Sequence, residues 1–278
     1  MSPDLKITMK VTSMVVLAAA VLGMGAARGE TSLKYGDRML YIHVPPRLPP
    51  EGSRSLVVVL HGGLGNAERI VSQGSEAGLN MNATADKYGF IVAYLNGTPV
   101  ARMLGDDKKG WNAGECCGMS SANNIDDVRY ISGAVQYLAR SYGINLKRVY
   151  GMGHSNGAMM ALRLMCETDL LASAVPVSGV LEVEAKSCPS ARGKGILAIR
   201  GADDENVPIA GGKGKGVSRT NFRSQEYTRQ VFVNSGARYM LQVLPGAEHR
   251  LETIDSAMEK AEGIGLSEKA ARFFGLSR

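Results

Sequence analysis

The amino-acid sequence predicts an α/β fold in which helices cover both faces of a mostly parallel sheet. Three observations lead to this prediction. Apolar strand-like runs alternate with helix-like runs along the 278 residues, as they do in parallel sheets. A Gly-x-Ser-x-Gly pentapeptide, residues 153–157, joins one strand-like run directly to a helix-like run. About 250 residues follow an N-terminal leader, a length that suits one domain with one core.

The expected elements follow one another without an internal repeat. Strands are expected at 56–60, 90–95, 148–152, 172–177, 195–200 and 238–244. Helices are expected at 125–142 and 267–274, and helical composition also follows the pentapeptide, at 158–164. The glycine-rich stretch 211–216 is expected to be a loop. Strands that alternate with helices in this way predict a doubly covered sheet.

The first 27 residues have the pattern of a secretory signal peptide. Lys6 and Lys10 precede an apolar run at 14–22, and small residues follow up to Ala27. The run is too short for a comfortable membrane span, and no cysteine near the cleavage site offers a lipid anchor. We therefore expect a secreted or periplasmic protein without a stable membrane anchor, cleaved near Ala27. Residues 28–278 would form its single domain.

The pentapeptide Gly153-His154-Ser155-Asn156-Gly157 is interpreted as a nucleophile elbow. A strand leads into it and a helix leads out of it, which is the context in which such a serine stands above a sheet. Glycines flank the serine because the sharp turn leaves no room for a Cβ atom. His154 is expected to pack or hydrogen-bond within the scaffold.

A serine nucleophile needs a base and an acid after it in the chain. His249 is the one histidine of four that follows Ser155, and a loop after the strand at 238–244 would present it. The acid should leave the strand at 195–200, where Asp203, Asp204 and Glu205 are adjacent. It would hold the imidazole in one tautomer and stabilise the imidazolium. Spacing alone does not choose among these three carboxylates.

The glycine-rich segment after the strand at 56–60 is a candidate oxyanion site. Gly63 would supply one backbone N–H and Asn156, the residue after the nucleophile, the other. The alternative is an ordinary strand-to-loop turn. His61, at the start of the segment, is expected beside the substrate. Trp111 is expected to border the acyl pocket or, equally, to anchor its own loop.

The cysteines can be assigned from the direction of the strands and helices. Cys166 lies eleven residues after Ser155 in the same helix, roughly 16 Å from the serine face at 1.5 Å per residue. Cys188 precedes the strand at 195–200 and should lie on that same far side. We expect a Cys166–Cys188 disulfide, which an exported protein allows. Cys116 and Cys117 would form an adjacent-residue bridge or stay thiols, and metal binding is not expected.

Several longer motifs resemble those of a family of secreted esterases, which groups polyhydroxybutyrate depolymerases with feruloyl and acetylxylan esterases. The matching segments span most of the chain and lie at 60–62, 111–118, 125–128, 148–150, 153–160, 204–208 and 249. The resemblance implies an α/β-hydrolase fold and a serine esterase that needs no cofactor. It also places the acid at Asp204. Arg250 and Ile209 depart from the residues common in the family near the expected cleft.

These features predict a serine esterase with a Ser-Asp-His triad and an acyl-enzyme. The expected substrate is a small ester or an ester-substituted oligomer, and the feruloyl, acetylxylan and hydroxybutyrate alternatives stay open. The formal net charge is +6, but no basic run with interleaved aromatic residues points to nucleic acid. The other readings are a non-catalytic secreted binding protein on a hydrolase fold and a secreted serine peptidase. The sequence leaves the oligomeric state open.

Overall fold

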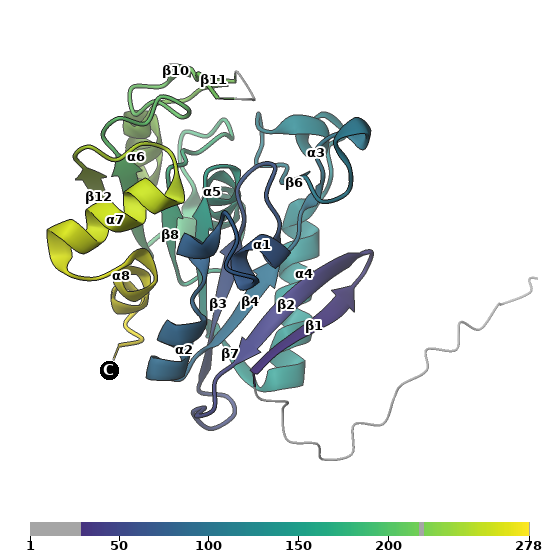
Figure 1. The fold of residues 1–278 in the computed structure, drawn as a ribbon. Helices are drawn as coiled ribbons and strands as arrows, with labels where there is room; N and C mark the ends of the chain where they lie inside the picture. The colour runs from purple at the N-terminus through teal and green to yellow at the C-terminus, as the bar shows by residue number, and fades with distance from the viewer. Residues whose placement is uncertain (1–28, 217–219, 278) are drawn as a thin grey trace, which may run out of the picture.

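A central sheet of eight strands organises the chain in the computed structural model, which describes residues 29–216 and 220–277 (Figure 1). The strand order is β1-β2-β4-β3-β7-β8-β9-β12. β2 runs antiparallel to its neighbours β1 and β4, and every other neighbouring pair is parallel. The mostly parallel sheet expected from the sequence is therefore confirmed.

The six strands expected from apolar runs all occur in this sheet. The eight strands of the sheet are β1 (Gly29–Tyr35), β2 (Arg38–Val44), β3 (Arg54–Leu60), β4 (Ile91–Leu95), β7 (Ile144–His154), β8 (Ser173–Val177), β9 (Gly195–Gly201) and β12 (Arg238–Leu244), of which β1 and β2 are additional to the six expected. Two short strand pairs lie outside the sheet: β5 (Thr98–Pro99) with β6 (Lys109–Gly110), and β10 (Gly212–Lys213) with β11 (Asn221–Phe222). The stretch 211–216, expected to be a loop, thus contains a short paired strand.

Helices form one layer on each face of the sheet. One face is covered by α4 (Asp127–Tyr142), α5 (Asn156–Glu167) and α6 (Gln225–Asn234). The other is covered by α1 (Ala67–Val71), α2 (Asn82–Tyr88), α7 (Leu251–Glu262) and α8 (Leu266–Phe273), which lie in front in Figure 1. The short α3 (Gly118–Ala122) lies apart from both layers.

Strand β3 shows why both faces need cover. Leu56, Val58 and Leu60 belong to the apolar cluster under α4 and α5, whereas Val57 and Val59 belong to the cluster under α1 and α7. Successive side chains of a strand point to opposite faces, so an entirely apolar strand is stable only between two layers.

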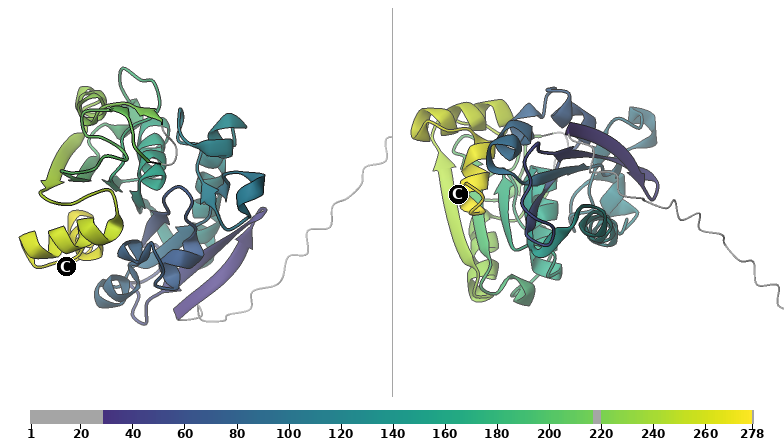
Figure 2. Two further views of the ribbon diagram at one scale, coloured as in Figure 1. Left: turned by 45° about the horizontal axis from the view of Figure 1, so that its top comes forward. Right: turned by 90° about the horizontal axis from the view of Figure 1, so that it is seen from below.

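The carboxyl ends of the parallel strands lie at one edge of the sheet. Figure 2 shows β12 (yellow-green) along one border of the sheet and β1 and β2 (purple) at the other. Between these borders β3, β7 and β9 run in the same direction, so the loops that follow them leave from a common edge. Ligands of open α/β sheets bind outside the carboxyl ends of the strands.

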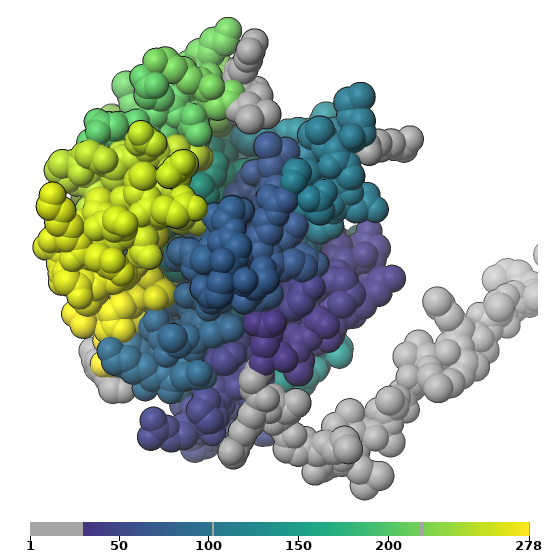
Figure 3. All heavy atoms as spheres, in the orientation of Figure 1, coloured from purple at the N-terminus to yellow at the C-terminus, as the bar shows by residue number. Residues whose placement is uncertain are grey.

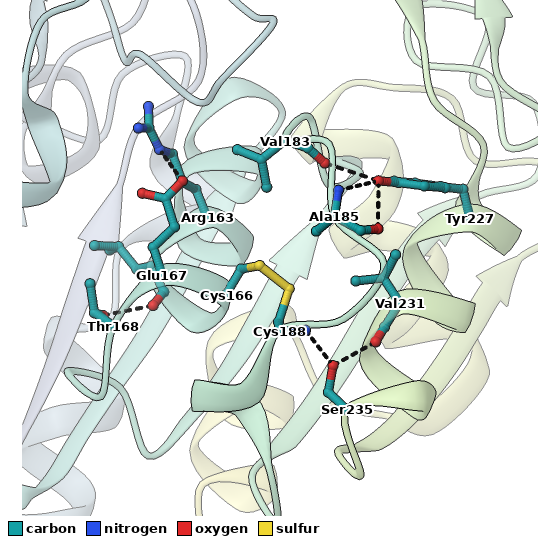
Figure 4. Close-up of a disulfide and its surroundings, with 11 residues drawn as sticks. Arg163, Cys166, Glu167, Thr168, Val183, Ala185, Cys188, Tyr227, Val231 and Ser235 are labelled. Atoms are coloured by element: carbon teal, nitrogen blue, oxygen red, sulfur yellow. Dashed lines mark hydrogen bonds and ion pairs between the residues drawn. A yellow bond between two sulfur atoms is a disulfide. The ribbon is translucent and has the colours of Figure 1, made fainter.

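A disulfide ties the far end of α5 to the segment before β9. Cys166 and Cys188 are bonded, as expected, and the Cys188 N–H donates to Ser235 Oγ at 2.6 Å (Figure 4). Tyr227 Oη donates to the carbonyls of Val183 and Ala185 beside it, both at 3.1 Å. Cys116 and Cys117 are also bonded to each other, which selects the bridge over the free thiols.

Nothing in the described part of the chain is both long and apolar enough to form a membrane-crossing helix. The expected signal peptide and its cleavage near Ala27 lie outside the described residues.

Candidate active site

Ser155 occupies a strained turn between β7 and α5. Its backbone has φ 51° and ψ −121°, a conformation that non-glycine residues rarely adopt and that is held only where the surroundings enforce it. The turn is close-packed: a Cβ on Gly157 would lie 2.2 Å from the carbonyl oxygen of Leu60. The glycine is therefore required by space, as the elbow interpretation expects.

Ser155, His249 and Asp204 form one hydrogen-bonded series. Ser155 Oγ lies 2.9 Å from His249 Nε2, and His249 Nδ1 lies 2.9 and 3.0 Å from the two carboxylate oxygens of Asp204. A carboxylate can only accept, so Nδ1 carries the hydrogen. Nε2 is then left to accept the hydrogen of the serine hydroxyl. The three residues come from the ends of β7, β9 and β12.

The turn after β9 selects Asp204 among its acidic neighbours. Asp204 is 5% exposed, whereas Asp203 and Glu205 are exposed. The N–H groups of Asn206 and Val207 donate to Asp204 Oδ1 at 3.0 and 2.9 Å. Of the three adjacent carboxylates, Asp204 is the one whose oxygens lie within hydrogen-bonding distance of His249 Nδ1.

A buried arginine completes the surroundings of Asp204. Arg200, the sixth residue of β9, is fully buried and its Nη2 lies 3.4 Å from Asp204 Oδ2. Burial by itself raises the pKa of Asp204, but the hydrogen bond and charge of His249, the Val207 N–H and the Arg200 guanidinium together hold that pKa below its usual value. Asp204 is thus an ionised partner for His249.

His154 supports His249 from behind. Its Nε2 donates to the backbone carbonyl of His249 at 2.8 Å, and the two rings are 4.9 Å apart. Burial lowers the pKa of His154 to about 3, so the ring is neutral. The expected scaffold role of His154 is confirmed, since it fixes the loop that presents His249.

The segment after β3 turns back beside the elbow. The N–H of Gly65 donates to the carbonyl of Gly62 at 3.1 Å, and a Cβ on Gly63 would lie 3.7 Å from Asn156 Cβ. Gly63 is exposed, and within residues 29–216 and 220–277 neither its N–H nor that of Asn156 donates to another protein group. Two adjacent free donors of this kind are what an oxyanion site requires.

Trp111 links the elbow to the segment after β3 from the interior. Its backbone N–H donates to Asn156 Oδ1 at 2.7 Å, and its indole N–H donates to the carbonyl of His61 at 3.0 Å. The Trp111 side chain is fully buried, so the structure does not place it on an exposed wall of an acyl pocket. Of the two roles that the sequence left open, this placement is that of an anchor.

His61 is also a structural residue in this arrangement, not an exposed one. The Gly97 N–H donates to its Nε2 at 3.0 Å, so Nδ1 carries the hydrogen and donates to the Gly62 carbonyl at 2.7 Å. Burial lowers the pKa of His61 to about 4, and the ring is neutral. With no exposed surface, His61 does not face a substrate in this structure, contrary to the expectation.

The sequence motifs do not include two buried ionisable side chains beside the site. One is Arg200, which ends an apolar run and could have been noticed as its single charged member. The other is Glu76, whose Oε1 accepts the N–H of Gly62 at 2.9 Å. Nothing in the sequence around Glu76 marks it. No group of three or more histidine, cysteine or carboxylate side chains among the described residues could hold a metal ion.

Known proteins with similar sequences are esterases by name. A Nocardia uniformis protein, NocK, whose name assigns it to the esterases, is 32% identical over 177 residues, covering 63% of this chain and 47% of that protein. A feruloyl esterase B of Neurospora crassa is 30% identical over 121 residues, covering 44% of this chain and 36% of that one. A poly(3-hydroxybutyrate) depolymerase of Ralstonia pickettii is 26% identical over 163 residues, covering 54% and 31%. The chain thus spans less than half the length of these relatives.

Similar solved structures have the same fold. A carboxylesterase of Bacillus cereus superimposes with a TM-score of 0.58 at 15% identity, covering 87% of this chain and 95% of that one. The poly(3-hydroxybutyrate) depolymerase LpqC of Bordetella parapertussis gives 0.55 at 14% identity, covering 89% and 95%. These likenesses confirm the α/β-hydrolase fold. The sequence model of a protein family described as "Esterase PHB depolymerase" matches residues 40–210. This chain therefore belongs to the esterase PHB depolymerase family.

Proposed function

We propose that the protein is a serine esterase that hydrolyses carboxylic esters through an acyl-enzyme. The observation that carries the proposal is the series Ser155–His249–Asp204, with 2.9 Å between Ser155 Oγ and His249 Nε2. The serine stands on a strained elbow beside the N–H groups of Gly63 and Asn156, which donate to no protein group in the part of the chain that the structure describes. A nucleophile, its base, the base's orienting acid and an anion site are the parts that acyl transfer needs.

The reaction would proceed in two halves. His249 Nε2 takes the hydroxyl proton as Ser155 Oγ bonds to the ester carbonyl carbon, and the carbonyl oxygen becomes an oxyanion between the N–H groups of Gly63 and Asn156. Collapse of this intermediate breaks the bond to the alcohol, which leaves with the proton from His249. A water molecule then gives a proton to His249 and attacks the acyl-enzyme. The acid is released and Ser155 Oγ regains its proton.

The ionised Asp204 stabilises the imidazolium that forms in each half. Its lowered pKa means that it stays an anion while His249 gains and loses its proton. The carboxylate also fixes Nδ1–H, so Nε2 always faces the serine.

The substrate class follows from the family and stays broader than one ester. Relatives are named for feruloyl esters and for poly(3-hydroxybutyrate), and both are carboxylic esters of hydroxyl compounds. We propose a small ester or an ester-substituted oligomer, with no nucleic-acid partner and an exported location that follows from the leader at residues 1–27.

Hydrolysis of an ester panel by the mature protein and its Ser155→Ala variant tests the proposal. The panel consists of p-nitrophenyl acetate and butyrate, methyl ferulate and a 3-hydroxybutyrate trimer. We expect turnover by the wild type and a loss of at least about 10³-fold in the variant, with unchanged thermal unfolding. A folded wild type that cleaves none of the esters would favour a binding protein on this fold. Equal rates in the two proteins would exclude Ser155 as the nucleophile.

A further inference from the structure

The turn that carries Gly63 is held by a carboxyl group that belongs to none of the motifs. Glu76 immediately precedes the short 3₁₀ helix η1 (Ala77–Leu79), and its Oε1 accepts the Gly62 N–H at 2.9 Å. Residues around it form part of the outer surface, seen in blue between the C-terminal helices (yellow) and the N-terminal strands (purple) in Figure 3. The side chain itself is only 8% exposed.

The carboxyl group fills the inside of this turn. A Cβ on Gly65 would lie 2.2 Å from Glu76 Oε1, and a Cβ on Gly62 would lie 3.0 Å from the same oxygen. The Cβ on Gly62 would also lie 3.1 Å from His154 Nδ1. Gly62 is therefore packed against both Glu76 and His154, and His154 in turn holds the backbone of His249. One series of contacts joins Glu76 to both halves of the site.

Filling this space with Glu76 destabilises the folded state relative to an apolar side chain. Its second oxygen, Oε2, is buried and makes no hydrogen bond within the described residues. A buried polar atom without a hydrogen bond destabilises the folded state, and an apolar side chain of the same size would avoid this penalty. What the carboxyl group supplies and an apolar side chain could not is an acceptor for the Gly62 N–H.

The group fulfils this role without burying a full charge at neutral pH. Burial raises the pKa of Glu76 to about 8, against the opposing effects of the Gly62 N–H and the positive charge of Arg69 in α1. The imidazoles beside this turn, His61 at its start and His154 at the end of β7, are both neutral because burial lowers their pKa values to about 4 and about 3. A neutral acid can accept the Gly62 hydrogen bond as a carboxylate would.

We propose that Glu76 is a positioning residue of the oxyanion site: it fixes Gly62 and thereby aims the N–H of Gly63 at the oxygen that becomes negative. This inference rests on the proposed esterase function. The oxyanion exists only after the serine has attacked, so a misplaced donor weakens the transition state more than it weakens substrate binding. A merely structural role for Glu76 would lower stability and leave the kinetic constants of the folded protein unchanged.

Two substitutions of nearly equal volume separate these roles. Glu76→Met fills the space without an acceptor, whereas Glu76→Gln keeps an oxygen for the Gly62 N–H. With p-nitrophenyl butyrate we expect kcat to fall about 10- to 100-fold in Glu76→Met with KM within about 3-fold, and Glu76→Gln to stay within about 3-fold of wild type. The affinity for an alkylboronic acid, which forms a tetrahedral adduct with the serine, should fall in parallel with kcat.

Thermal unfolding shows which variants are folded. If Glu76→Met does not fold, Glu76→Asp withdraws the oxygen by one methylene and gives the same test. A folded variant without the Gly62 acceptor but with wild-type kcat would overturn the inference, as would equal losses in the Met and Gln variants. The activities of the wild type and of the Ser155→Ala variant are measured alongside. An inactive wild type would overturn the proposed function and this inference with it. An active wild type with an unaffected Glu76→Met variant would overturn the inference alone.

Discussion

Asp204 and Glu76 are two buried carboxyl groups on different sides of the same site. Asp204 accepts the hydrogen bond of His249, and Glu76 accepts the N–H of Gly62 in the turn that carries Gly63. Asp204 is 5% exposed and Glu76 is 8% exposed, so burial disfavours the charged form of both. Their pKa values nevertheless move in opposite directions, below the usual value for Asp204 and up to about 8 for Glu76. Burial alone therefore does not decide whether a carboxyl group beside this serine is charged.

The difference lies in how many donors each carboxyl group meets. Both oxygens of Asp204 are within reach of donors: His249 Nδ1, the N–H groups of Asn206 and Val207, and the guanidinium of Arg200. Glu76 meets a single donor, the Gly62 N–H, and its Oε2 has no partner in the part of the chain that is described. Each hydrogen bond that a carboxylate accepts stabilises the anion; at Asp204 several donors together outweigh burial, whereas at Glu76 the single Gly62 N–H does not.

This contrast matches the two tasks. The imidazolium that forms during acyl transfer needs an anion beside it, which Asp204 supplies. The oxyanion site needs fixed donors and gains nothing from a negative charge nearby, and Glu76 provides an acceptor for its turn that is uncharged at neutral pH.

Removing the charge of Asp204 should have the largest effect. Asp204→Asn keeps the shape of the side chain but no longer stabilises the imidazolium or enforces the Nδ1–H tautomer. We expect kcat for p-nitrophenyl butyrate to fall about 10³- to 10⁴-fold. Asp203→Asn, an exposed carboxylate next in the chain, is the matched control and should stay within about 2-fold. A loss of less than about 10-fold in Asp204→Asn would remove Asp204 from the triad.

Removing the ionisable group of Glu76 should change how stability depends on pH. In the unfolded chain Glu76 ionises near 4.5 and in the folded chain near 8, so the folded protein holds the proton more tightly. The stability that this group contributes is full below about pH 4.5 and is lost as the pH rises through 8, by a few kcal/mol at most. Glu76→Gln does not titrate. Its unfolding temperature relative to wild type should therefore rise between pH 5 and pH 9.

Denaturation scans of both proteins at pH 5, 7 and 9 measure this difference. Parallel curves for wild type and Glu76→Gln would show that Glu76 ionises at an ordinary pKa in the folded protein. The contrast with Asp204 would then be wrong.

Crowding the Glu76 carboxyl group should have the smallest of these effects. In Gly65→Ala the new methyl group would lie 2.2 Å from Glu76 Oε1, so the carboxyl group or the turn must move. We expect a loss of about 1–3 kcal/mol in unfolding free energy, together with a lower kcat. Gly63→Ala is a steric control for the stability measurement alone, because its methyl group would make an ordinary 3.7 Å contact with Asn156 Cβ. Equal stability losses in the two variants would contradict the close packing around Glu76.

The sequence predicts the series Ser155–His249–Asp204 much better than it predicts the turn held by Glu76. Ser155 and His249 follow from the elbow and from chain order, because both lie where a strand with a clear apolar pattern ends. The acid could be narrowed only to three adjacent residues by position, since the N–H groups of Asn206 and Val207 that select Asp204 depend on the shape of the turn. Family resemblance identified it where spacing did not.

The contact of Glu76 could not be predicted, because it forms only when the chain after α1 returns to the turn at Gly62. Its partner, the Gly62 N–H, is 14 residues away, across α1 and an irregular segment without periodicity. For a related reason the sequence predicts His61 beside the substrate and leaves Trp111 either at the acyl pocket or as the anchor of its own loop. A sequence shows that a side chain lies near the site, but only packing shows whether it faces the substrate or the interior. β1 and β2 are not among the strands expected from apolar runs, because polar and charged residues interrupt the apolar pattern of both.

Covalent labelling with a fluorophosphonate probe tests whether Ser155 is an activated nucleophile, because only an activated serine reacts at an appreciable rate. The labelled residue is identified by peptide mass spectrometry in the wild type, in Ser155→Ala and in Asp204→Asn. We expect a single adduct on Ser155, none in Ser155→Ala, and labelling slowed by orders of magnitude in Asp204→Asn. An unlabelled but folded wild type, or a label on another residue that persists in Ser155→Ala, would contradict this expectation.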